Sequence, residues 1–132
     1  MRTSDATCPD AGSIVSSWLI KVVVAIGLVA VVIMDGVSVV SANIQLKDAT
    51  VQAARDASAV RSSNKRVVVA AADASLASAN ADNVLVTRSV QVSPDGTVTL
   101  SAQRTAPTLV MHYIPRLRDY ATVHATGSGK AV

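Results

Sequence analysis

The feature that constrains this fold most is an apolar stretch close to the N-terminus. Residues 14–34 contain a single charge, Lys21. A membrane-spanning helix needs about 20 predominantly apolar residues, so this stretch predicts one. Its charge-free part, residues 22–34, is too short to span by itself, and a span must also use residues before or after it. We therefore expect a transmembrane helix within residues 14–42.

Two charged residues, Lys21 and Asp35, leave two registers open for this helix. If Lys21 sits at one interface, the span runs to about Ser41. Asp35 then lies inside the bilayer and needs a partner, for example Lys21 of a neighbouring helix. If Ile14 sits at the interface, with Trp18 as an interfacial anchor, Asp35 marks the far boundary of the membrane. We favour the boundary position for Asp35.

The helical pattern continues past the apolar stretch in a different form. Small and apolar residues recur at spacings of three, four and seven over residues 43–61, which predicts one packed helix face. Small side chains let helices approach closely, so we expect this face to contact other helices, including those of other subunits. The predicted helix-packing face consists of Ala42, Leu46, Ala49, Ala53, Ala57 and Val60.

The rest of the chain predicts an α+β domain. Residues 62–64 break the first helix, and the Ala-rich residues 65–82 predict a second one, so residues 43–82 form an Ala-rich helical region. From residue 83 the apolar period changes to two, and the turn sequence at 93–96 predicts a hairpin. With a strand near residues 120–126, residues 83–126 predict a small antiparallel sheet of about three strands. Val84, Val86, Val90 and Val92 are expected on one face of the first strand.

Both ends of the chain read as irregular. Residues 1–13 are polar, with one proline and one glycine, and predict a disordered tail. Residues 127–132, GSGKAV, predict a flexible C-terminus. The single cysteine, Cys8, has no partner for an internal disulfide.

Composition gives no support to catalytic or nucleic-acid functions. The net charge is only +3, the basic residues are scattered, and three aromatic residues offer little for base stacking, so no nucleic-acid partner is expected. The two histidines, His112 and His124, lack acidic neighbours at zinc-ligand spacing. No hydrolase, phosphate-loop or metalloprotease motif is present. We expect a non-enzymatic protein with no cofactor and no metal.

The order of these segments resembles a known family. The tail with AGS, the apolar helix ending near Asp-Gly, the continuation LKDATVQAARDASA, and the later SPDGTVTLSAQ, APTLVMHYIP and YATVHATGSGKA are similar to TadE/TadG-like proteins of tight-adherence (Flp) pilus assembly systems, the actinobacterial members above all. The resemblance implies a minor pilin-like or pseudopilin-like membrane protein. It also implies a cytoplasmic N-terminus, an extracytoplasmic domain and other pilus or secretion subunits as partners. A homo-oligomer is a further partner expectation.

Processing and orientation stay open at this point. Members of this group are cut after a glycine, with a glutamate five positions later; here Gly12 and Ser13 would flank the cut, and Ser17 stands at the glutamate position. The alternative is a secreted α+β binding domain whose leader is cut near Ala42, after the small-residue sequence VSA. Lys and Arg residues are more numerous after the span than before it, which taken alone favours a cytoplasmic C-terminal domain.

Overall fold

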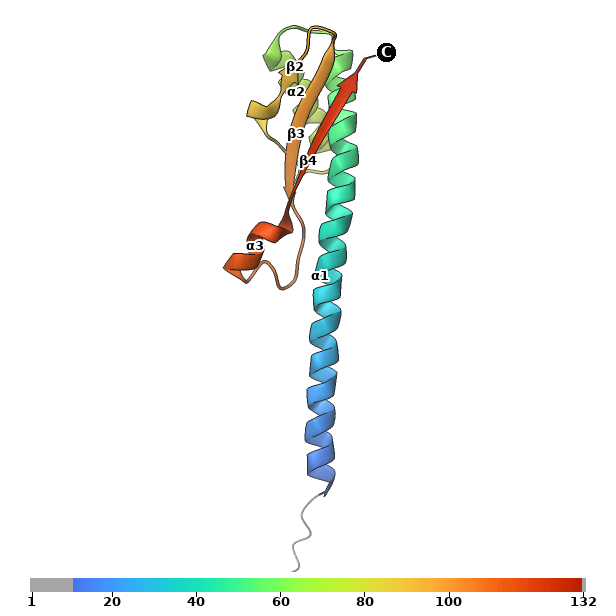
Figure 1. The fold of residues 1–132 in the computed structure, drawn as a ribbon, viewed down its shortest axis with the longest axis vertical. Coiled ribbons are helices and arrows are strands. Elements are labelled where there is room, and N and C mark those ends of the chain that lie inside the picture. The colour runs from blue at the N-terminus through green and yellow to red at the C-terminus, as the bar shows by residue number, and fades with distance from the viewer. Residues whose placement is uncertain (1–10, 132) are drawn as a thin grey trace, which may run out of the picture.

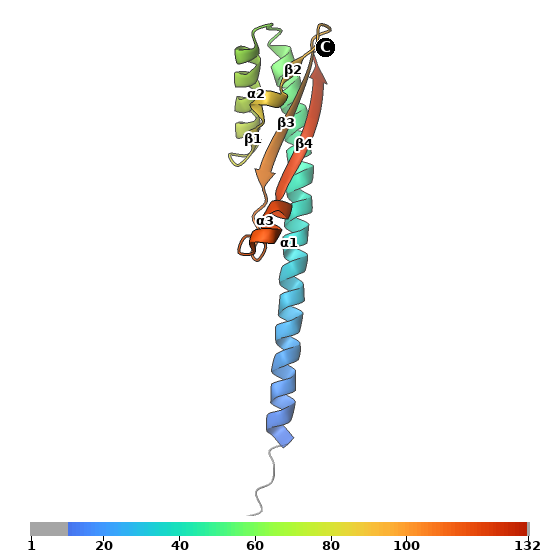
Figure 2. The same cartoon turned by 60° about the vertical axis from the view of Figure 1, so that its left-hand side comes forward.

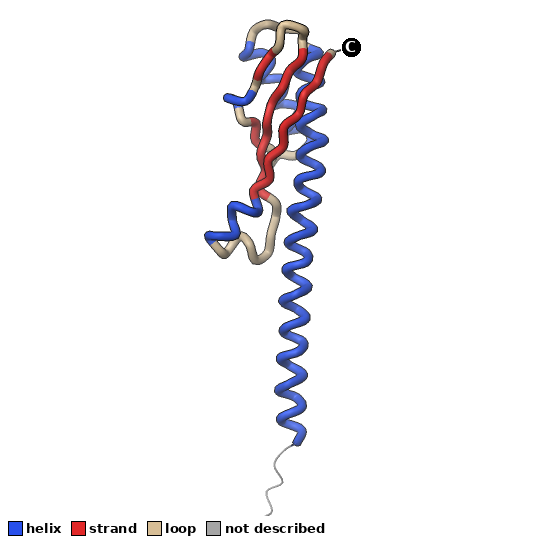
Figure 3. Tube along the Cα trace, in the orientation of Figure 1, coloured by secondary structure: helices blue, strands red, loops and turns tan. Residues whose placement is uncertain are grey.

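Helix α1 runs unbroken from Ala11 to Ala59 and organises the whole molecule (Figure 1). The computed structural model describes residues 11–131. The N-terminal half of α1 has no other element beside it, whereas the C-terminal half carries a small α+β domain (Figures 1 and 3). The predicted disordered tail falls mostly on residues outside the described range, but its last three residues, 11–13, belong to α1.

The predicted break between the two helices is confirmed. Helix α2 spans Lys65–Ala79, and Asn64 caps it by accepting a hydrogen bond at its side-chain oxygen from the Arg66 amide, at 3.0 Å. Asp56 of α1 accepts hydrogen bonds from Gln52 of its own helix, at 2.9 Å, and from Ser75 of α2, at 2.6 Å. The buried residues Val68, Ala72 and Leu76 face the core from α2.

The sheet is antiparallel and is built around one long central strand, β3, which spans Thr97–Thr105. Strand β4, Thr122–Lys130, pairs along its full length on one side of β3. The two-residue strands β1, Val84–Leu85, and β2, Gln91–Val92, pair with opposite ends of β3 on the other side. The α+β fold predicted from the sequence is confirmed, with four strands in the sheet.

One detail of the predicted hairpin is wrong. The strand expected over residues 84–92 is interrupted by a 3-10 turn at Thr87–Ser89, so the alternation cannot run through it. Leu85 and Val90 are the buried residues here, while Val84 and Val92 are exposed. The interruption shifts the pleat, and a shift by one residue exchanges the two faces of a strand.

The helices α1 and α2 lie on one side of the sheet (Figure 2). The residues of β3 and β4 that face the other side are polar, such as Thr99 and Ser128. On β3 the covered face carries Val98, Leu100 and Ala102, which are buried. Their partners on β4 are Gly129, Gly127 and Ala125, all small. Because the bulk lies on β3 and the small residues on β4, the backbone of α1 can lie directly against β4.

The glycines of β4 show why this close contact depends on sequence. A side-chain carbon placed on Gly127 would come within 2.8 Å of the Thr50 carbonyl carbon and the Val51 nitrogen. At Gly129 the backbone of Ala54 and Arg55 would be closer still. The prediction of a flexible C-terminus at 127–132 is therefore wrong for residues 127–130, which complete β4 and pack on α1. Gly127 and Gly129 thus allow the backbone of β4 to contact the backbone of α1.

Candidate functional site

Asp35 is the most unusual polar residue in the structure, because it is 98% buried on a helix whose neighbouring residues are mostly exposed and apolar. Its carboxylate accepts three backbone hydrogen bonds from one loop. The amides of Leu109, Val110 and Met111 donate to it at 2.7, 2.9 and 3.2 Å. A carboxylate that accepts several amide hydrogen bonds is held in its ionised form and fixes the position of the donors.

The spacing along α1 explains why Asp35 faces the domain. Asp35, Ala42 and Ala49 are seven residues apart, which places them on one side of the helix. Ser38, one turn after Asp35, donates a hydrogen bond from its hydroxyl to the Pro107 carbonyl at 2.7 Å. The loop after β3 is thus attached to α1 at two successive turns.

These contacts change the interpretation of Asp35 and Lys21. The interhelix partner that Asp35 would need inside the bilayer, the less favoured of the two registers, is replaced by backbone amides of its own chain, 74 to 76 residues away. Lys21 lies exposed on the uncovered half of α1. Gly12 and Ser13, the candidate processing site, lie in the first turn of α1. Asp35 is a structural anchor for the loop 107–111, a role for which the sequence carries no local motif.

The predicted helix-packing face is buried, but its partners differ from those expected. All but one of its members lie in the core, covered by α2, β3 and β4 of the same chain. Val60 is exposed because α1 ends at Ala59. The expectation that this face binds other subunits is therefore wrong, since the domain already occupies it. The buried members are Ala42, Leu46, Ala49, Ala53 and Ala57.

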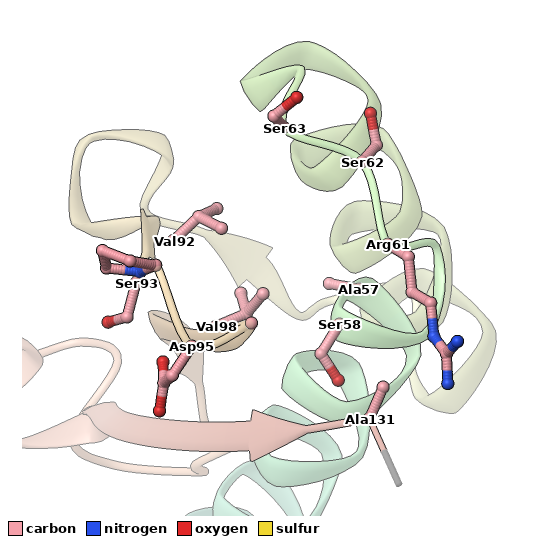
Figure 4. A pocket seen from close by; sticks show the side chains of 12 residues that line it. Ala57, Ser58, Arg61, Ser62, Ser63, Val92, Ser93, Asp95, Val98 and Ala131 are labelled. Carbon is pink, nitrogen blue, oxygen red and sulfur yellow. The ribbon is translucent and has the colours of Figure 1, made fainter.

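One cavity of the domain has an acidic residue that is engaged in local contacts. The cavity in Figure 4, about 590 Å³, lies between the end of α1 and the turn at residues 93–96. Its acidic residue, Asp95, accepts hydrogen bonds from the amide and hydroxyl of Thr97 and lies 3.8 Å from the Lys130 ammonium. The Thr97 amide, with the hydroxyl and Lys130, lowers the pKa of Asp95. These contacts stabilise the turn and leave the carboxylate engaged.

A second cavity, about 500 Å³, is lined by Arg104 and Asn83. Arg104 donates to the Gln45 side chain at 3.2 Å, and Asn83 donates to the Leu76 carbonyl at 3.1 Å. Arg104 Nε and Asn83 Oδ1 have no further partner among residues 11–131. The cavity has room for ordered water, which satisfies such atoms in many proteins. Within the described residues, no three His, Cys, Asp or Glu side chains gather as a metal site.

Comparison with known proteins gives no relative for this chain. No protein-family model, no curated protein and no solved structure matches it.

Proposed function

We propose that this chain is a single-pass, non-enzymatic membrane protein that holds a small α+β domain at the bilayer surface. The observation that carries the proposal is the uncovered half of α1. Most of its large apolar side chains, for example Leu19, Ile26 and Leu28, are more than half exposed, and its most apolar stretch has a mean hydropathy of 2.6. By length and composition this helix is able to cross a membrane.

The loop bound to Asp35 supports one of the two registers. Residues 14–34 would span about 31 Å at 1.5 Å per residue, close to the thickness of the hydrocarbon core. Asp35 and the loop 107–111 then lie just outside the hydrocarbon. In the alternative register, from Lys21 to Ser41, this irregular loop would enter lipid, where exposed non-helical backbone is not tolerated.

The alternative of a leader cut near Ala42 receives no support from the fold. A cut there would remove Asp35 and Ser38, which hold the loop 107–111 through four hydrogen bonds. It would also remove or expose Ala42, which is buried in the core. The domain uses the end of the apolar helix as part of its own structure, which favours retention of the helix in the mature protein.

The finer part of the proposal is a role as a minor pilin-like component of a tight-adherence type pilus assembly or secretion apparatus. The resemblance in segment order supports it. The N-terminus would be cytoplasmic and the domain extracytoplasmic. The small-residue face is occupied by the domain. For contacts with other subunits we propose the outer face of α1, where the exposed apolar surface continues from the uncovered half through Ile33, Val37, Val40 and Ile44.

Photocrosslinking in the native cell tests this proposal. A photoreactive residue replaces Val40 on the outer face of α1, and Val84, exposed on β1, serves as the matched control. We expect position 40 to form adducts with pilus or secretion subunits and position 84 to form none. Adducts with unrelated proteins only, or none at position 40, would reject the pilus assignment. Release of the full chain from membranes by alkaline carbonate would reject the anchor itself. The intact mass of the native protein would show whether it starts at Met1, Ser13 or Asn43, and a start at Asn43 would also reject the anchor.

A further inference from the structure

The segment 107–121, called the foot from here on, is the part of the domain that reaches furthest down along α1. It contains the loop after β3 and helix α3, Pro115–Ala121. In Figures 1 and 2 it lies below the sheet, beside the middle of α1 and closest to the uncovered half. The foot therefore lies beside the part of α1 where the covered half ends and the uncovered half begins.

The position of the foot along α1 is fixed by hydrogen bonds to two residues of that helix. Pro107 is attached at Ser38, and the next residues of the loop are attached at Asp35, nearer the N-terminus of α1. The loop thus descends toward the uncovered half as it proceeds. The Ala106 amide donates to the Ala121 carbonyl at 2.7 Å and closes the segment at its base.

The surface of the foot combines exposed aromatic and apolar side chains with charged ones. Tyr113 and Tyr120 are 81% and 70% exposed, and Leu109 and Ile114 are also exposed. Within α3 only Ala121 is buried. A small domain that exposes several large side chains together commonly uses them for contact with a partner or a membrane.

The distribution of aromatic residues points to the membrane as that partner. The chain has one Trp, two Tyr and no Phe. Trp18 lies near the N-terminal end of the proposed span, and both tyrosines lie in the foot, at the level of its other end. Trp and Tyr concentrate at the two membrane interfaces, where the ring is half in lipid and half in water. Arg116 and Arg118 of α3 outnumber its one acidic residue, Asp119, and leave net positive charge beside the tyrosines, which suits anionic headgroups.

We propose that the foot lies in the headgroup layer of the bilayer that α1 spans, with its tyrosines at the interface and its arginines beside lipid phosphates. This inference rests on the proposed membrane anchor. Its consequence is that the domain is held against the membrane at two points, α1 and the foot, so that it cannot swing freely about the helix.

Tryptophan quenching by brominated lipid tests the foot directly. The full chain is reconstituted in vesicles whose phosphatidylcholine carries bromine near the headgroup end of its acyl chains. In a Trp18→Phe background, Tyr113→Trp and Tyr120→Trp place one reporter in the foot. Val92→Trp, at an exposed position of β2, is the matched control. We expect the foot reporters to be quenched several-fold more than the control.

The native Trp18 separates failure of this proposal from failure of the anchor. If Trp18 of the unsubstituted chain is quenched but the foot reporters behave like the control, the foot proposal is wrong and the anchor stands. If Trp18 is not quenched, the anchor fails, and the foot proposal fails with it.

The arginines provide a second test. In vesicles with added phosphatidylglycerol, we expect quenching of the Tyr113→Trp reporter to increase. The double substitution Arg116→Gln with Arg118→Gln should remove that increase, whereas Arg55→Gln, far along α1, should leave it unchanged. An increase that survives the double substitution would overturn the part of the proposal that assigns the arginines to lipid phosphates.

Discussion

The two halves of α1 have the same backbone and different surroundings. Residues 14–34 carry large apolar side chains on every side of the helix, and almost all of them are exposed. Residues 35–59 carry small buried residues on one face, whereas the exposed face is apolar as far as Ile44 and polar beyond it, for example at Lys47 and Asp48. A helix that is apolar all round suits lipid, and an amphipathic helix suits a protein core. One continuous helix therefore combines a segment suited to lipid with a segment suited to a protein core, without a change in secondary structure.

The difference also shows what small residues contribute. Alanine and glycine bury little area each, so the covered half gains little from any one of them. They let backbones approach closely, and many weak contacts form along the length of α1 and β4. The domain is thus stabilised by close packing along the whole contact between α1 and β4. Its stability should therefore fall when a side chain in this contact is enlarged as well as when one is shortened.

The largest loss of stability is expected when the largest fully buried side chain of α1 is shortened. We expect Leu46→Ala to lower the free energy of unfolding of the domain by about 3 kcal/mol, because Leu46 is fully buried. Ile44→Ala, two residues away on the exposed face, should change it by less than about 0.5 kcal/mol. Urea unfolding of the full chain in detergent micelles, followed by circular dichroism, measures both. Equal losses would show that the two faces are not distinct.

Added volume on β4 should be nearly as harmful. Gly129→Ala places a carbon against the backbone of Ala54 and Arg55, and neither can move without displacing α1. We expect a loss of about 2 kcal/mol, typical of overpacking in a tight interface. Ser128→Ala, on the opposite and exposed face of the strand, is the control. If Gly129→Ala were as stable as this control in the same urea titration, the close contact between β4 and α1 would be wrong.

A smaller and more local effect is expected where the two halves of α1 meet. Asp35→Asn replaces a carboxylate with an amide that has one acceptor oxygen, so at least one of three loop amides loses its partner. We expect about 1 kcal/mol of local destabilisation. Hydrogen exchange at the amides of residues 109–111 should become faster, with little change in β3. Asp48→Asn on the exposed face should have no such effect, and identical exchange in both variants would remove Asp35 as the anchor of the loop.

The smallest expected effect lies at the far end of the domain, at Asp95. Its hydrogen bonds from Thr97 and the nearby Lys130 lower its folded-state pKa below that of the unfolded chain. The carboxylate therefore contributes stability above the unfolded-state pKa, and this contribution is lost as the pH falls through the folded-state pKa. Between pH 5 and 2, Asp95→Asn should make urea midpoints less dependent on pH, whereas Ser78→Ala, an exposed change that removes no titratable group, should not. An unchanged pH dependence in Asp95→Asn would contradict the assignment.

Periodicity predicted the parts of this fold that depend on one segment at a time. The buried face of α1 follows from the spacing of Ala42, Leu46, Ala49, Ala53 and Ala57, and α2 from the Ala-rich sequence after the break at residues 62–64. What covers that face could not be predicted, because a stripe of small residues fits a neighbouring subunit and a strand of the same chain equally well.

The candidate site shows the same limit. The partners of Asp35 are backbone amides, which every residue except proline possesses, so no side-chain pattern identifies them. The glycines at 127 and 129 resemble a flexible end in composition, and only the position of α1 against β4 gives them a structural role. A spacing of seven residues from Asp35 to Ala42 and Ala49 was the one available sign that the carboxylate faces the domain.

Labelling of single cysteines along α1 tests the central claim most directly. In a Cys8→Ser background, cysteines replace Val24 and Leu28 in the uncovered half, and Lys47 and Gln52 on the exposed side of the covered half. The full chain is reconstituted in vesicles and treated with a membrane-impermeant maleimide from the side of the domain. The account predicts rapid labelling at positions 47 and 52, and labelling at 24 and 28 only after detergent is added. Equal labelling at all four positions without detergent would contradict a bilayer around the uncovered half of α1.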